Sequence, residues 1–128
     1  MIYSSRELVQ RMTEAFLKGD AATVQDYWAE DIVWYFPGRS GLAGVFHGKA
    51  AVLRHLSQPP RSGVSMKLAP RAFFGDEQYG AVSYEITSTL NSKTLTETRV
   101  MVCKIVNEKI VETRIYPGDQ YALDDFWS

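Results

Sequence analysis

Residues 79–116 constrain the fold most, because they have the pattern of three consecutive β-strands joined by two tight turns. The first predicted strand covers Tyr79–Leu90, where apolar and polar side chains alternate with the period of two that is typical of a strand. The second covers Leu95–Val106 and the third Ile110–Tyr116, and each intervening turn begins with an asparagine. Strands linked this closely must be antiparallel neighbours. The pattern therefore predicts a meander with one large concave face that something must fill.

The second strand of this meander is apolar on both faces. Arg99, Met101 and Cys103 share one face, and Val100 and Val102 share the other. A strand with apolar residues on both faces is covered on both faces. We therefore expect a core on one side of the sheet and a further contact on the other.

Composition narrows the class of protein. The 128 residues suit one domain spanning 1–128. The net charge of -1 gives no electrostatic footprint for nucleic acid or an anionic membrane, and the single cysteine excludes an internal disulfide. No signal-peptide pattern and no membrane-spanning apolar stretch is present in the sequence, so a cytoplasmic location is expected. Aromatic residues are abundant, and such side chains build cores and pockets for flat apolar ligands.

The first half of the chain is predicted to hold three helices. The first runs from Ser4 to Lys18, begins with a capping-box pattern and stops at Gly19. The second starts at the cap Asp20 and extends to about Trp28. The third covers residues 49–57 and is closed by a Pro-Pro pair at 59–60.

Further strands are predicted at Asp31–Phe36, at 45–47 as a very short strand, and at Val64–Phe74. A short C-terminal helix capped by Asp119 follows the meander. The residues of this helix expected to pack back are Tyr121, Leu123, Phe126 and Trp127. Helices segregated from an antiparallel sheet predict an α+β fold.

Several motifs resemble one known group of proteins. These motifs are Ala15-Phe16-Leu17-Lys18-Gly19-Asp20, Trp28-Ala29-Glu30-Asp31-Ile32-Val33-Trp34, Phe36-Pro37-Gly38-Arg39-Ser40, Phe46-His47-Gly48-Lys49 and Tyr116-Pro117-Gly118-Asp119-Gln120-Tyr121. They resemble the nuclear transport factor 2-like superfamily, in particular its SnoaL-like and ketosteroid isomerase-like branch. The resemblance implies a cone-shaped, half-open barrel in which a curved, mostly antiparallel sheet wraps around three helices. It also implies a homodimer that pairs through the outer face of the sheet, which would cover Val100 and Val102.

The same resemblance identifies positions at which to look for chemistry. Ketosteroid isomerase-like enzymes use a carboxylate base and an oxyanion hole made of a tyrosine and a protonated aspartic acid. By motif alignment the base becomes Phe36, the oxyanion-hole tyrosine Met12 and the aspartic acid Met101, and a further pocket tyrosine becomes Leu56. Hydrocarbon and thioether side chains cannot abstract a proton. Isomerisation by that mechanism is therefore not expected, and whether the chain is an enzyme stays open.

Strand phase gives the candidate ligand-binding residues. Those expected to face the cone or its mouth are Trp34, Phe36, Tyr84, Arg99, Met101, Cys103, Thr113 and His47. For the aromatic residues, the alternative is an ordinary core or pocket wall. For Cys103, a buried small side chain is favoured over a nucleophile, because no histidine is placed to activate it.

Arg99 and His55 have two interpretations each. An inward Arg99 needs a carboxylate, a phosphate or a protein acid, because an unpaired buried guanidinium is costly. The alternative places Arg99 at the solvent rim, paired with Glu97 or Glu112. His47 and His55 lie with Arg39 near the expected mouth, and one residue of helix register decides whether His55 faces solvent or the pocket.

Two functional hypotheses follow. The first is a homodimer whose apolar, aromatic-lined cavity binds a small hydrophobic molecule, with an acid group on that molecule as a target for Arg99. The resemblance suggests an isomerase-, cyclase- or hydrolase-like reaction if the protein is an enzyme. The alternative is a non-catalytic dimeric interaction module whose cone is plugged by Trp34, Phe36, Met101 and Trp127. No metal, no cofactor and no nucleic acid are expected, because the sequence has no metal-ligand spacing and no phosphate-binding glycine loop.

Overall fold

The computed structural model describes residues 3–57 and 63–128. Its helices are α1 (Ser5–Leu17), α2 (Ala21–Asp26), α3 (Lys49–Ser57) and α4 (Gln120–Phe126). Its strands are β1 (Trp28–Phe36), β2 (Gly44–His47), β3 (Val64–Gly75), β4 (Tyr79–Leu90), β5 (Lys93–Val106) and β6 (Lys109–Pro117). The α+β class predicted from the sequence is confirmed.

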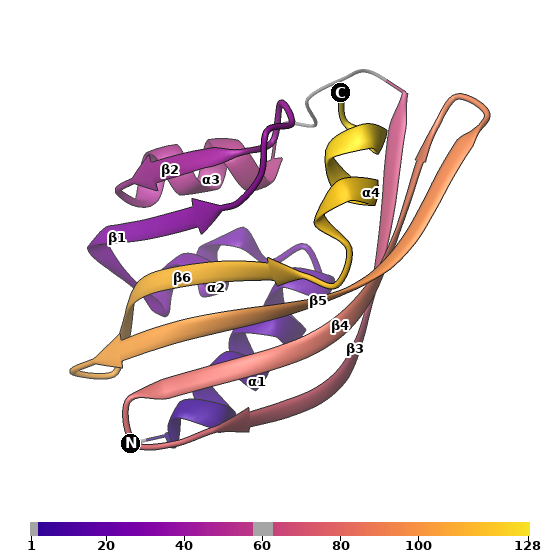
Figure 1. The fold of residues 1–128 in the computed structure, drawn as a ribbon. Coiled ribbons are helices and arrows are strands. Elements are labelled where there is room, and N and C mark those ends of the chain that lie inside the picture. The colour runs from indigo at the N-terminus through magenta and orange to yellow at the C-terminus, as the bar shows by residue number, and fades with distance from the viewer. Residues whose placement is uncertain (1–2, 58–62) are drawn as a thin grey trace.

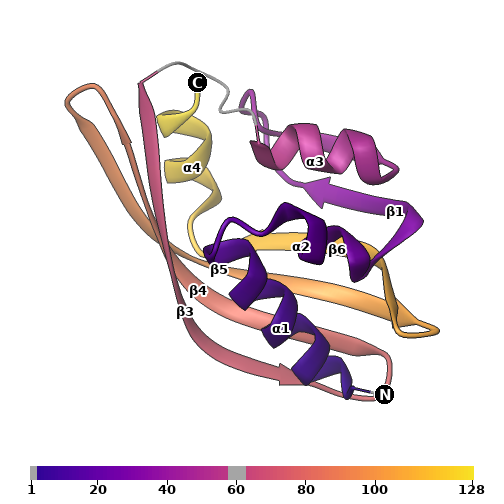
Figure 2. The ribbon, with the colours of Figure 1, turned by 180° about the vertical axis from the view of Figure 1, so that it is seen from behind.

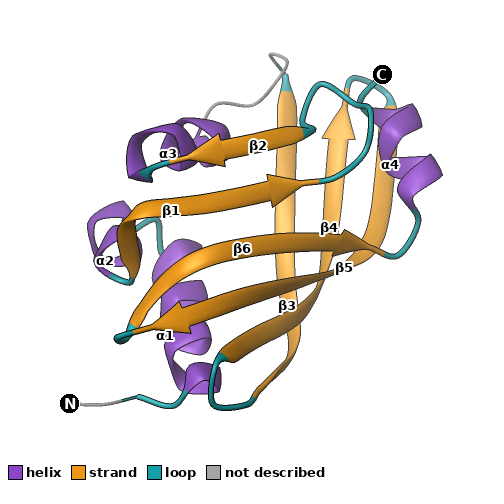
Figure 3. Ribbon diagram, turned by 60° about the vertical axis from the view of Figure 1, so that its left-hand side comes forward, coloured by secondary structure: helices purple, strands orange, loops and turns teal. Residues whose placement is uncertain are grey.

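The strands form one sheet in the order β2-β1-β6-β5-β4-β3 (Figures 1 and 3). The predicted meander is the antiparallel run β4-β5-β6, and β1 joins it by pairing in parallel with β6. The sheet is therefore mixed, with the parallel pair β1–β6 among antiparallel pairs. Register places Tyr84 opposite Arg99 and Met101 opposite Ile115, so the inward side chains of neighbouring strands meet on one face.

The long strands bend, and the helices α1 and α2 lie on their concave side (Figures 1 and 2). On the edge strand β3 the register shifts between Pro70 and Ala72. A bulge bends a strand, and an edge strand tolerates a proline that donates no hydrogen bond to the ladder. The curved, unclosed sheet and its helices make the half-open cone that the resemblance implied.

Side-chain caps fix where the helices begin. Ser4 Oγ accepts a hydrogen bond from the Glu7 amide at 3.1 Å, and Asp20 Oδ1 accepts one from the Thr23 amide at 3.1 Å. Asp119 Oδ1 accepts a hydrogen bond from the Ala122 amide at the start of α4. Each contact satisfies a helix N–H that has no partner inside the helix. The predicted closure of α3 by the Pro-Pro pair at 59–60 lies outside the described residues.

Two details of the prediction were wrong. Trp28 begins β1 instead of ending the second helix, because the Tyr27 carbonyl accepts a hydrogen bond from the Ile110 amide and ties the chain to β6. Tyr121 does not pack back, since its side chain is 90 % exposed, whereas Leu123, Phe126 and Trp127 are buried.

The outer face of the sheet is partly apolar. Val100 and Val102 are half-buried, and Tyr116 on the neighbouring strand is exposed. Pairing of two copies through this face stays a prediction. Within residues 3–57 and 63–128, no helix combines the length and apolarity needed to cross a membrane.

Candidate functional site

A cavity with a volume of about 230 Å³ lies between the helices and the concave face of the sheet. Residues of α1, α2, α3 and five of the strands line it, together with Leu42. Phe16 on α1 and Met66 on β3 belong to the lining and are about half exposed, so they mark where the cavity meets solvent. The cavity is thus enclosed by the fold and open at one rim.

Strand β1 supplies an aromatic wall. Trp28, Trp34 and Phe36 all line the cavity and are all buried. The rings of Trp28 and Trp34 meet edge to face, with centroids 6.3 Å apart. Such a wall suits the flat face of a ring-containing molecule.

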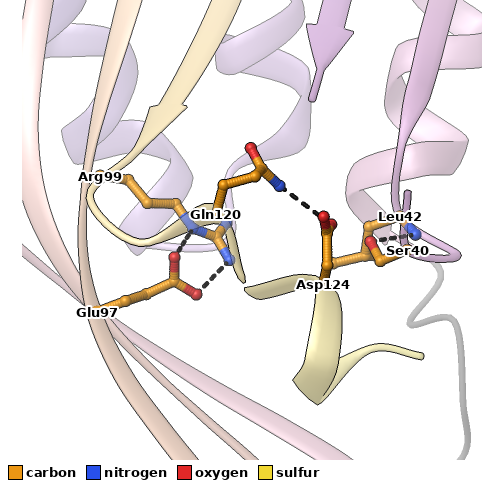
Figure 4. A network of polar contacts seen from close by, with 6 residues as sticks. All are labelled: Ser40, Leu42, Glu97, Arg99, Gln120 and Asp124. Carbon is orange, nitrogen blue, oxygen red and sulfur yellow. Dashed lines mark hydrogen bonds and ion pairs between the residues drawn. The ribbon is translucent and has the colours of Figure 1, made fainter. Parts of the chain in front are cut away.

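The one cationic side chain that lines the cavity within the described residues is Arg99, and it is paired with a protein acid. Arg99 Nε donates to Glu97 Oε1 at 3.1 Å, and Arg99 Nη2 donates to Glu97 Oε2 at 3.0 Å (Figure 4). The exposed fractions are 5 % for Arg99 and 8 % for Glu97, so the pair is buried. The guanidinium carbon also lies 5.2 Å from the centroid of the Phe36 ring, a cation–π distance.

Glu97 decides between the inward and the solvent-rim interpretation of Arg99. The sequence interpretation did not include Glu97 among the site residues. The sequence interpretation treated an inward Arg99 and a pair with Glu97 as exclusive, but the structure has both. Residues at i and i+2 of a strand share a face, and this rule could have placed Glu97 beside Arg99 on the inner side. Burial would lower the pKa of Arg99, but the hydrogen bonds of Glu97, together with the interactions of Tyr84 and the Glu97 charge, outweigh burial and raise it.

Tyr84 lies directly opposite Arg99 in the β4–β5 ladder and also lines the cavity. Burial raises the pKa of the Tyr84 phenol, and the neighbouring Arg99 guanidinium lowers it by less. The phenol therefore stays protonated and can donate a hydrogen bond at neutral pH.

His55 is the second residue that the sequence left undecided, and it faces the cavity. Its ring stacks on Phe46 with centroids 4.1 Å apart and meets the edge of Phe36 at 5.5 Å. Burial, with a smaller contribution from the Arg99 charge, lowers the pKa of His55 to about 4. His55 is therefore neutral at pH 7.

Acidification should destabilise the protein through His55. The pKa of His55 in the folded state lies below its unfolded value near 6.5, so the unfolded chain binds more protons between pH 7 and pH 4. The free energy of unfolding therefore falls as the pH falls through this window. A shift of this size corresponds to about 3 kcal/mol for a fully buried group, and partial exposure of His55 reduces the expected loss to about 1–2 kcal/mol. Urea unfolding at pH 7 and pH 4.5 measures this loss in the free energy of unfolding.

The control for this prediction uses the other histidine. His55→Phe keeps an aromatic ring for Phe46 and should lose about 1–2 kcal/mol less than the wild type on acidification. His47→Gln changes an exposed residue and should retain the wild-type loss. Equal pH dependence in the wild type and His55→Phe would contradict a depressed pKa at His55.

The structure brings five of the eight candidate residues together on the cavity wall. These five are Trp34, Phe36, Tyr84, Arg99 and Met101. Cys103 and Thr113 are fully buried outside the lining, where Thr113 Oγ1 contacts Cys103 Sγ at 3.5 Å. Burial raises the pKa of the Cys103 thiol to about 12, which leaves it unreactive.

Neither His47 nor Arg39 lines the cavity. His47 is exposed on β2 and lines a separate surface groove beside the start of α3. Arg39 is exposed too, and its amide donates to Asp124 Oδ1 at 3.0 Å. The short strand β2 pairs with β1 at the edge of the sheet, which turns His47 away from the cavity.

The four positions aligned with ketosteroid isomerase chemistry all line the cavity. They are Met12, Phe36, Leu56 and Met101. None can act as an acid or a base. Within the described part of the chain, no group of three or more His, Cys, Asp or Glu side chains is arranged to hold a metal ion.

A model of the SnoaL-like domain family matches residues 9–113, which is most of the chain. An uncharacterised protein of Mycobacterium tuberculosis is 26% identical over 125 residues, covering 95% of each chain. The family model covers all of the motifs named above except the closing one at 116–121.

Solved structures agree on the fold. An NTF2-like protein from Burkholderia xenovorans superposes with a TM-score of 0.83 at 24% identity, covering all of both chains. TerC, crystallised with polyporic acid, superposes with a TM-score of 0.78 at 22% identity, covering 95% of this chain and 97% of TerC. These likenesses support the nuclear transport factor 2-like architecture.

Proposed function

The chain belongs to the SnoaL-like domain family, and from this premise we propose that it binds a small, hydrophobic, ring-containing molecule inside the cone. The observation that carries the proposal is the cavity of about 230 Å³ with an aromatic wall and a few polar side chains, among them Tyr84, Arg99 and His55. Ligand pockets have this composition, mostly apolar with a few convergent polar atoms. TerC, which has this fold, was crystallised with a small molecule, polyporic acid, which is consistent with small-molecule binding.

The volume limits the size of the ligand. A cavity of about 150 Å³ accommodates benzene, so about 230 Å³ suits a molecule of about ten non-hydrogen atoms. The cavity is open at Phe16 and Met66, so a longer molecule can extend toward solvent. Naphthalene, with two fused rings, is the matched probe.

Two observations favour binding over the alternative of a plugged interaction module. Trp34, Phe36 and Met101 stand as walls around the cavity, and Trp127 packs on Phe126 outside the lining. The proposal covers binding and no reaction, because the four positions aligned with catalytic residues of ketosteroid isomerase-like enzymes are apolar.

Filling part of the cavity should weaken binding. Leu56 on α3 lines the cavity and is half-buried, so Leu56→Trp adds a ring that competes for the same space. Titration calorimetry should give a naphthalene Kd of about 10–100 μM for the wild type and at least about tenfold weaker binding for Leu56→Trp.

Leu53→Trp is the matched control, because Leu53 lies on the same helix but lines the separate surface groove. It should bind naphthalene like the wild type. Failure of the wild type to bind naphthalene up to its solubility limit would overturn the proposal, as would equal binding by Leu56→Trp.

A further inference from the structure

The cavity wall contains a cation whose counter-charge is already present. Glu97 binds Arg99 through both carboxylate oxygens, at 3.1 Å and 3.0 Å, and both side chains are more than nine-tenths buried (Figure 4). The pair has no net charge. An acid group on a ligand would therefore bring an unbalanced negative charge into an apolar, low-dielectric space.

The two members of the pair are placed differently. Arg99 lines the cavity and Glu97 does not. Nε and Nη2 of Arg99 donate hydrogen bonds to the Glu97 carboxylate. The two N–H groups of Nη1 make no hydrogen bond to Glu97. The phenol of Tyr84 is the direct neighbour of Arg99 across the ladder and lines the same cavity. At Tyr84 and Arg99 the wall therefore presents donors, and the Glu97 carboxylate lies outside the lining.

Other polar groups of the lining are less available to a ligand. Trp28 and Trp34 line the cavity, but their Nε1–H groups, which have no acceptor among the described residues, are buried away from accessible space. Thr13, another lining residue, already donates its hydroxyl proton to the Val9 carbonyl at 2.8 Å. A molecule that supplies an acceptor oxygen to Tyr84 and Arg99 therefore fits this wall better than one that supplies a donor.

We propose that the molecule bound in the cavity is uncharged and carries a carbonyl oxygen that accepts hydrogen bonds from Tyr84 and Arg99, and that Glu97 makes the site discriminate against carboxylates. This inference rests on the proposed function and adds the chemical class of the ligand. It replaces the expectation that Arg99 binds an acid group, because Glu97 already occupies that role.

The test uses three probes of nearly equal shape: isopropylbenzene, acetophenone and benzoate. They differ in having no oxygen, a neutral carbonyl, or a carboxylate on the same ring. Binding is followed by NMR chemical-shift titration, because this method can measure weak binding. For the wild type, acetophenone should bind about 3- to 10-fold more tightly than isopropylbenzene, and at least about 10-fold more tightly than benzoate.

Glu97→Gln should remove the preference for acetophenone over benzoate. The amide keeps the shape of the side chain but removes the negative charge, so Arg99 becomes an uncompensated cation facing the cavity. Benzoate affinity should rise at least about 10-fold, with acetophenone within about 3-fold of the wild type. Glu85→Gln is the matched control, because Glu85 pairs with Arg71 and lies outside the cavity lining. It removes the same charge and should change neither affinity.

Tyr84→Phe gives an independent test if Glu97→Gln does not fold. Its acetophenone affinity should fall about 3- to 10-fold, with isopropylbenzene unchanged. Benzoate binding to the wild type as tightly as acetophenone, unchanged benzoate affinity in folded Glu97→Gln, or unchanged acetophenone affinity in Tyr84→Phe would each overturn the inference. If isopropylbenzene, acetophenone and naphthalene all fail to bind, the proposed function itself fails.

Discussion

Replacing Arg99 by methionine alone should lower the free energy of unfolding by about 3–5 kcal/mol. The substitution leaves the Glu97 carboxylate buried, at 8 % exposure, without the cation that donates hydrogen bonds to both of its oxygens. A buried charge without a partner costs much more than the lost contacts alone. Urea unfolding at pH 7 measures the change.

Two further variants separate the charge from the packing. In Glu97→Leu/Arg99→Met both charges are gone, so the double variant should lie within about 1–2 kcal/mol of the wild type. Arg114→Met removes a cation from the exposed pair with Glu112 and should cost less than about 1 kcal/mol. If the double variant is as unstable as Arg99→Met, the loss comes from packing and the pair is not the cause.

Gly80→Ala should lower the free energy of unfolding by about 2–3 kcal/mol. Gly80 lies on β4 where α1 crosses the sheet, and an added Cβ would overlap the Ser5 carbonyl oxygen and lie 2.6 Å from Val9 Cγ2. Both are parts of α1, and the first is backbone, so the helix would have to move away from the sheet. Thermal or urea unfolding detects this loss.

Gly41→Ala is the control for this effect. A Cβ at Gly41 meets nothing within 4 Å, so its stability should stay within about 0.5 kcal/mol of the wild type. A Gly80→Ala variant as stable as Gly41→Ala would show that α1 does not press on β4 as closely as the structure has it.

The sequence was sufficient for most of the fold, because its local signals agree. Alternation identified β4, and side-chain caps at Ser4, Asp20 and Asp119 identified helix starts. It failed at Trp28, where pairing with β6 decides the conformation and is not encoded in the neighbouring residues. It also failed at Tyr121, since a helix as short as α4 gives too few turns to fix which face is buried.

The sequence predicted the candidate site residues wherever strand phase alone determines which face of the sheet a side chain occupies. Phase alone placed Tyr84, Arg99 and Met101 on the concave face. It could not tell that Cys103, on the same face, lies outside the cavity lining, because this depends on how the helices cover the sheet. The choice between His47 and His55 likewise depends on how β2 and α3 pack, which is a tertiary property.

Methionine-methyl NMR tests most directly whether the cone holds a binding cavity. Met12, Met66 and Met101 reach the lining from α1, β3 and β5, so three methyl groups report from different sides. On titration with naphthalene, these three resonances should move together through ring-current shifts and saturate at a single Kd. A titration to the solubility limit of naphthalene in which none of the three moves would contradict the cavity as a binding site.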